Sequence, residues 1–278
     1  MTLRITTLSE NTAGTRDLLA EWGLSFLIET GPETILFDTG KTISTAHNID
    51  SLGVNLSKVS KIVLSHGHYD HTGGLRQVLR RIGKEIEVIA HPDIWAPKYR
   101  HRKGKKDRYI GIPFQRQELE SLGATFVLNS KSVKVAANCI TTGEVPMVTD
   151  YETIDSGLFI RTDSGWQPDQ LFDDLSLVLN TELGLVVVLG CAHRGIINIL
   201  YHAQNLTGVK TIHAVLGGAH LIDAPRERVQ RTIADLKKLD VQKLGPCHCT
   251  SLPVIATLAH EFGDRFFFNI TGTIFELP

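Results

Sequence analysis

A short apolar run followed by a dense group of metal-binding side chains constrains this chain more than any other feature. Residues 61–64 have the length and composition of a buried strand. Three histidines and one aspartate then fall within six residues, at His66, His68, Asp70 and His71. Residues two apart in an extended chain point the same way, so His66 and His68 can face one ion. Without a cation these side chains would repel and desolvate one another, so the pattern predicts a divalent metal site.

The same residues carry a resemblance to a known family. His66-Gly67-His68-Tyr69-Asp70-His71, with Phe37-Asp38-Thr39-Gly40 upstream, resembles the metallo-β-lactamase superfamily. Within it, the chain is similar to a branch labelled dihydropteroate synthase-related, or dihydropterin-ribofuranosylaminobenzene-phosphate synthase-like. The segments behind this narrower resemblance are spread over the chain, at residues 65–75, 190–195, 216–221 and 246–250. The resemblance implies an α/β fold, the four-layer αββα sandwich, as one domain over residues 1–278 with the site on one rim.

The composition excludes several classes of protein. A formal charge of −1 gives no general attraction to nucleic acid, and no apolar run approaches the roughly 20 residues that span a bilayer. The N-terminus reads as a first strand and lacks the pattern of a signal peptide. The four cysteines lie singly or beside histidines, which indicates reduced thiols rather than a disulfide framework. We therefore expect a cytoplasmic protein with neither a membrane nor a nucleic-acid partner.

The pattern of apolar residues indicates mixed α/β structure in both halves. Helices are expected at 42–52, 75–82, 195–205 and 225–238, and the last strands at 266–270 and 272–275. In the second half, three predicted strands are each followed by a histidine: 184–190 by His193, 212–216 by His220 and 241–245 by His248. Because strand ends gather on one rim in α/β folds, these histidines are candidate site residues.

The resemblance also implies how ligands are shared between two metal ions. His66 and His68 would bind the first ion, and Asp70 and His71 the second. His248 occupies the place of the last histidine of the family. Asp38 is expected to orient a ligating histidine rather than to bind metal.

The chain departs from the family pattern at two other ligand positions. Glu144 stands where a histidine is usual, and Cys191 stands where a bridging aspartate is usual. His193 is expected to supply the missing imidazole as a ligand or a base, and Cys191 and Glu144 are further candidate ligands. A thiolate favours zinc, with manganese, iron or magnesium as alternatives, and the number of divalent ions is one or two.

Catalysis is expected to depend on metal, because no nucleotide fingerprint or serine-nucleophile elbow is present. Asp70, His193 and His220 are the candidate catalytic residues, as acceptors or donors of protons. The basic segment at 98–108 is either a solvated loop or a lid that attracts a small anionic substrate. Three functions remain open: a hydrolase of phosphate-bearing or ester substrates, a pterin diphosphate-dependent transferase, and a metal-binding sensor without activity.

Overall fold

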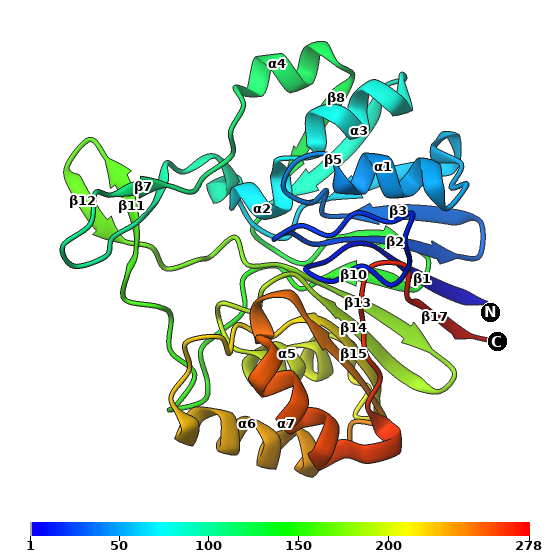
Figure 1. Ribbon diagram of the computed structural model, residues 1–278, viewed down its shortest axis with the longest axis vertical. Coiled ribbons are helices and arrows are strands. Elements are labelled where there is room, and N and C mark those ends of the chain that lie inside the picture. Colours follow the sequence, from blue (N-terminus) through cyan, green and yellow to red (C-terminus); the bar gives the residue numbers. More distant parts are fainter. Residues whose placement is uncertain (1) are drawn as a thin grey trace. The chain divides into compact units, whose positions relative to one another are not determined.

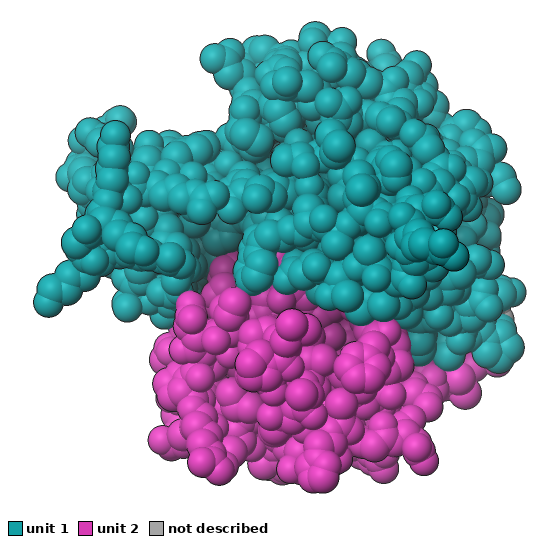
Figure 2. Space-filling view, in the orientation of Figure 1, with its two compact units in different colours: residues 1–130, 154–173, 270–278 teal, residues 131–153, 174–269 magenta. Residues whose placement is uncertain are grey.

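The computed structural model describes residues 2–278, which form two compact units (Figures 1 and 2). The first unit comprises residues 2–130, 154–173 and 270–278, and the second comprises residues 131–153 and 174–269. Each unit has its own main sheet and its own hydrophobic core. That both belong to a single domain stays a prediction.

The main sheet of the first unit has seven strands in the order β17-β1-β2-β3-β4-β5-β8. The pairs from β17 to β3 are antiparallel and those from β3 to β8 are parallel. The strands are β1 (Leu3–Ser9), β2 (Ser25–Thr30), β3 (Glu33–Phe37), β4 (Val59–Val63), β5 (Ile86–Ala90), β8 (Ala124–Leu128) and β17 (Ile274–Leu277). Because parallel strands end on the same edge, the segments after β3, β4 and β5 lie together.

Helices cover one face of this sheet. These are α1 (Ser44–Ser51), α3 (Leu75–Ile82) and α4 (Arg116–Ser121), and the short helix α2 (Tyr69–Thr72) carries part of the predicted ligand motif. In α3 the buried residues Leu75, Val78, Leu79 and Ile82 recur at helical spacing and pack against the apolar side chains of the strands. The helix ends at Gly83, which adopts the left-handed conformation typical of that position.

A small sheet, also in the first unit, contains the basic segment. Its four strands lie in the order β12-β11-β6-β7 and are β6 (Lys98–Arg100), β7 (Arg108–Tyr109), β11 (Leu158–Thr162) and β12 (Gly165–Pro168). The basic segment is therefore a hairpin, and the sequence analysis did not predict these two short strands. Only its turn is a solvated loop, since residues 102–107 are exposed whereas Lys98 is 1% exposed.

The second unit repeats this arrangement. Its six-stranded sheet has the order β16-β15-β14-β13-β10-β9, in which β14, β15 and β16 are parallel. The strands are β9 (Lys134–Ala136), β10 (Cys139–Thr141), β13 (Ser176–Thr181), β14 (Gly184–Leu189), β15 (Ile212–Gly218) and β16 (Lys243–Cys247). The helices that pack on it are α5 (Ile196–Thr207), α6 (Arg226–Lys238) and α7 (Leu252–Phe262).

The strand predicted at 266–270 is wrong. This segment runs beside β16 but forms only one bridge, between Leu244 and Phe266, and one backbone bond from Phe267 N–H to the Leu244 carbonyl (3.0 Å). The Asn269 side-chain amide then donates to the Gly245 carbonyl (3.2 Å), so a side chain takes the place of the next ladder bond.

Candidate metal centre

The first unit brings the predicted histidines of the ligand loop together. His66 Nε2 and His68 Nδ1 are 3.0 Å apart, and the rings of His66 and His71 have centroids 4.3 Å apart. His66 and His71 are fully buried, and His68 and Asp70 are nearly so. The loop directly follows β4, so the strand fixes where the cluster begins. We call His66, His68, Asp70 and His71 the first-unit cluster.

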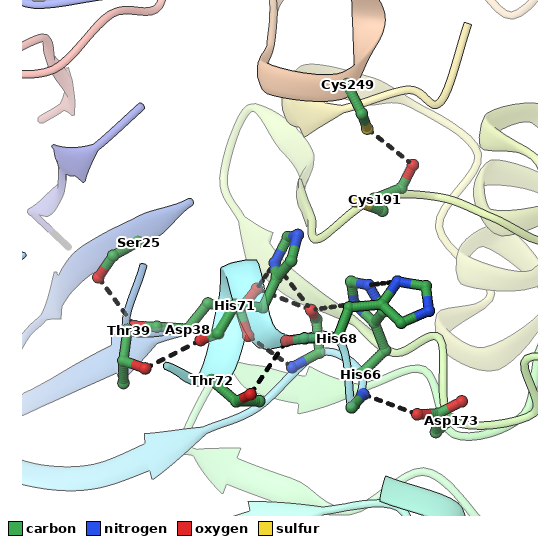
Figure 3. A network of polar contacts seen from close by, with 12 residues as sticks. Ser25, Asp38, Thr39, His66, His68, His71, Thr72, Asp173, Cys191 and Cys249 are labelled. Carbon is green, nitrogen blue, oxygen red and sulfur yellow. Dashed lines mark hydrogen bonds and ion pairs between the residues drawn. The ribbon is translucent and has the colours of Figure 1, made fainter. Parts of the chain in front are cut away.

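Asp38 holds this cluster in position, as the sequence predicted. Its Oδ2 lies 2.6 Å from His71 Nδ1 (Figure 3). Its Oδ1 accepts from Ser65 N–H (2.7 Å), and the Ser65 hydroxyl donates to Oδ2 (2.7 Å). The Ser65 hydroxyl also lies 2.9 Å from His66 Nδ1. A carboxylate on Nδ1 fixes the tautomer of a histidine and leaves Nε2 as the metal-binding atom. Asp38 reaches Ser65 because β3 and β4 are parallel neighbours with Phe37 opposite Val63.

A buried ion-pair network contacts the ligand loop at the turn between His66 and His68. The Lys98 ammonium lies 2.8 Å from Asp169 Oδ2 and 2.9 Å from Asp173 Oδ1, and Asp173 Oδ2 accepts from Gly67 N–H (2.8 Å). A Cβ at Gly67 would come within 2.4 Å of the Ile94 carbonyl, so only glycine fits between the two histidines. The chain thus ties the turn between His66 and His68 to a fixed charge network.

Burial and neighbouring charges favour the neutral form of His68 and the charged form of Lys98. Burial, followed by the charge of Lys98, lowers the pKa of His68 to about 3, so its ring is neutral at pH 7. For Lys98 itself burial would lower the pKa, but Asp173 and Asp169 raise it above its ordinary value. A neutral imidazole is the form that binds metal, and the lysine stays charged.

The second unit gathers its own potential ligands where parallel strands end. Ligand atoms of Cys191, His193 and His220 lie within 4.8 Å of one another, and so do those of Cys191, His248 and Cys249. Cys191 and His193 follow β14, His220 follows β15, and His248 and Cys249 follow β16. We call these five residues the second-unit cluster. Cys191 belongs to both groups, so the segments that follow β14, β15 and β16 adjoin at this residue. That the three histidines serve one site stays a prediction.

The backbone of the second-unit cluster adopts an unusual conformation. Ala192, His220 and His248 all have positive φ, at 54°, 44° and 53°, although none is glycine. Asp38 in the first unit has φ 58°. Such residues cost of order 1–3 kcal/mol each and concentrate at functional sites, because the site requires the side-chain direction that they give. The Cys249 thiol also donates to the Cys191 carbonyl at 3.5 Å (Figure 3).

Both clusters fit a divalent transition metal. The first offers imidazoles and a carboxylate, and the second offers imidazoles and thiols, and each of these donor sets can bind a divalent transition metal. In the second, His220 Nδ1 is buried and has no hydrogen-bond partner within residues 2–278, so a cation would satisfy it. Glu144, predicted as an alternative ligand, is exposed and lies outside the second-unit cluster.

Sequence reasoning did not find the support residues. Lys98 read as part of a basic surface segment, and Asp169 and Asp173 lie about 70 residues further along the chain. Cys249, next to His248 in the sequence, is not among the predicted ligands but belongs to the second-unit cluster. The available signal was the Cys-His-Cys spacing, which places two thiols around one histidine.

Known proteins resemble this chain over most of its length. The model of the family described as the metallo-beta-lactamase superfamily matches residues 23–248. A Methanocaldococcus jannaschii protein named 7,8-dihydropterin-6-methyl-4-(beta-D-ribofuranosyl)-aminobenzene-5'-phosphate synthase is 33% identical over 95% of this chain and 93% of its own. An uncharacterized protein of the same organism, MJ0448, is 31% identical over 96% of this chain and 97% of its own.

Solved structures extend the comparison. The crystal structure of Tm1679, described as a metal-dependent hydrolase of the beta-lactamase superfamily, has a TM-score of 0.85 and 27% identity, covering 99% of each chain. The predicted αββα fold class is therefore confirmed.

Among residues 2–278, none of the helices combines the length and the apolar character needed to cross a membrane.

Proposed function

Because the chain belongs to the metallo-β-lactamase superfamily, and within it to the branch of the dihydropterin-linked synthase, we propose that it is a metal-dependent enzyme acting on a small phosphate-bearing substrate. The observation that carries this proposal is the first-unit cluster, with His71 oriented by Asp38. A buried histidine held on a carboxylate is the usual arrangement around a protein-bound metal.

Different residues of the chain would bind the metal and transfer protons. His66, His68, Asp70 and His71 would hold one or two ions, with zinc favoured by the thiols of the second unit. A divalent ion, when bound, would lower the pKa of a water ligand to about 7 and would neutralise charge on phosphoryl oxygens. Asp70, as a carboxylate, can accept a proton from the attacking group.

The second unit supplies the remaining roles. His193 or His220 would protonate the leaving group, and their rings lie with centroids 4.0 Å apart. His248 and Cys191 would complete the metal shell. That His248 shares an ion with first-unit ligands stays a prediction, based on the place that His248 occupies in the family motif.

Hydrolysis is the first candidate reaction. Water is the simplest acceptor for a phosphoester, and Tm1679, which is similar to this chain over its whole length, is described as a hydrolase. Synthesis is the second candidate, favoured by the name of the Methanocaldococcus relative. In that case a pterin methyl diphosphate would lose diphosphate, its methylene carbon would form a bond with the amine nitrogen of an aminobenzene ribosyl phosphate, and that nitrogen would lose a proton.

One set of assays separates these candidates. Purified protein is analysed for metal, reloaded with zinc or manganese, and given bis-p-nitrophenyl phosphate. Separately it receives a pterin methyl diphosphate with and without the aminobenzene acceptor. Release of nitrophenol supports hydrolysis, whereas diphosphate release that requires the acceptor supports synthesis. Metal binding without turnover in any assay would make the protein a sensor.

Two alanine variants test the ligand assignment. We expect His68→Ala and His248→Ala each to lower the metal content, measured by mass spectrometry, below one ion per chain. His47→Ala is the control, since its ring contacts the Asp17 carbonyl at the surface. Full metal content in the His68 variant would refute the role of that residue.

A further inference from the structure

A pocket lies beside the ligand loop, within the first unit. Its volume is about 430 Å³, within the range of small-molecule sites. Tyr69, which stands between the predicted ligands His68 and Asp70, forms part of its wall. The lining residues that matter here are Lys41, Tyr69, Arg76, Arg108, Tyr109 and Phe114.

In the part of the chain that the structure describes, two cations of the pocket have no carboxylate as an ion-pair partner, although the Glu21 carboxylate accepts a hydrogen bond from the backbone N–H of Lys41. Within residues 2–278 neither the Lys41 ammonium nor the Arg108 guanidinium forms an ion pair with a carboxylate. Arg76 is different, because Glu118 lies 2.6 Å from its Nε. Lys41 and Arg108 therefore have no ion-pair partner among the described residues, and Arg76 has one. This arrangement of positive charges favours a ligand with two negative charges over a ligand with one.

Aromatic rings accompany these cations. Lys41 Nζ lies 5.7 Å and the Arg108 guanidinium carbon 5.1 Å from the ring centroid of Tyr69. Arg108 also donates to the Tyr69 hydroxyl (2.9 Å), and Arg76 lies 4.3 Å from the ring centroid of Phe114. Flat guanidinium groups and rings on the walls of one pocket offer stacking surfaces for a planar ligand.

The pocket is held in shape by the backbone. The N–H of Lys41 donates to a Glu21 carboxylate oxygen (2.8 Å), and Tyr69 N–H donates to the Ile110 carbonyl (2.9 Å). Gly73 allows the loop to approach, since a Cβ there would come within 2.0 Å of the Lys41 carbonyl. A preformed site loses less free energy to ordering when a ligand binds.

We propose that this pocket binds a planar aromatic ring that carries a dianionic phosphate. The ring stacks among Tyr69, Tyr109 and Phe114, and the phosphate pairs with Lys41 and Arg108. Arg108 is then the member of the basic segment that meets the substrate, whereas Lys98 is buried in the support network. This inference deepens the proposed function by naming the substrate class of that site, and it rests on that function only for the chemistry that follows binding.

A non-cleavable probe tests the binding step. Phenylphosphonate has the ring and, at pH 8.5, two charges, and its carbon–phosphorus bond resists hydrolysis. Calorimetric titration of the full, metal-loaded chain compares it with benzenesulfonate, which has one charge, and with methylphosphonate, which has no ring. We expect phenylphosphonate to bind about tenfold or more tightly than either, from one extra charge-assisted contact or one stacked ring.

Variants locate the binding to this pocket. Arg108→Met and Lys41→Met are each expected to weaken phenylphosphonate binding about tenfold. Lys103→Met is the control, because Lys103 is exposed in the turn of the same hairpin. Metal content and turnover are measured on the same samples, so loss of metal would overturn the proposed function alone. Equal affinity for the three probes, or variants that bind as the wild type does, would overturn the pocket.

Discussion

Lys98→Met is the perturbation that the structure predicts in most detail. It removes the ammonium and keeps most of the apolar stem, so packing changes little. Asp169 and Asp173, 2.8 Å and 2.9 Å from that ammonium, would remain buried without their cation. Breaking a buried pair by removing one partner costs about 3–5 kcal/mol. Because two carboxylates lose the same partner, we expect a loss near the upper end of that range.

The effect should depend on pH with a definite sign. In the wild type, Asp173 and Asp169 raise the pKa of Lys98 above 10.5 against the effect of burial, so its contribution is complete below pH 10 and is lost only at higher pH. In the variant, burial and Asp173 raise the pKa of Asp169 with no lysine to oppose them. A raised carboxyl pKa disfavours the folded state as pH rises through it, so the deficit should be larger at pH 8 than at pH 5.

Urea denaturation followed by circular dichroism at both pH values measures this. Lys103→Met, which removes a charge from the exposed turn of the same hairpin, should change the free energy of unfolding by less than about 0.5 kcal/mol. Since Asp173 also accepts from Gly67 N–H, metal affinity should fall together with stability. A loss below about 1 kcal/mol in the Lys98 variant, independent of pH, would refute the reasoning.

Two further predictions concern the ligand loop and the core. Asp38→Asn should weaken metal binding about 10- to 100-fold, because it changes the partner that orients His71, and competition with a chelator measures this; unchanged affinity would contradict it. Burial raises the pKa of Cys139 to about 12, so iodoacetamide at pH 8 should label this thiol only after denaturation, which mass spectrometry detects. Labelling of the folded protein would contradict this and would show that the core around Cys139 opens.

The parts of the site that sequence predicted are local. A strand followed by His-x-His-x-Asp-His fixes both the loop and its position at a sheet edge, so His66, His68 and His71 could be placed from their spacing alone. His193, His220 and His248 could be placed in the same way, because each follows an apolar strand. Asp38 depended on the resemblance, and the register of β3 and β4 explains its position.

The parts that sequence did not predict depend on distant partners. Lys98 lies among exposed basic residues, and only the approach of Asp169 and Asp173 buries it. The segment at 266–270 has the composition of a strand, yet Phe268 is 63% exposed and the amide of Asn269 interrupts the ladder. Propensity describes what a segment favours alone, whereas tertiary contacts decide these two cases.

The pairing of β17 with β1 has a consequence for biosynthesis. Leu3 lies opposite Leu277 and Thr6 opposite Ile274, so an edge of the seven-stranded sheet is formed by residues that are far apart in the sequence. A nascent polypeptide emerges from the ribosome at about 5–20 residues per second, and such long-range pairing forms slowly. The second unit is complete by residue 269. The first unit acquires β17 only after translation has passed Leu277, so β1 keeps an unpaired edge until that point.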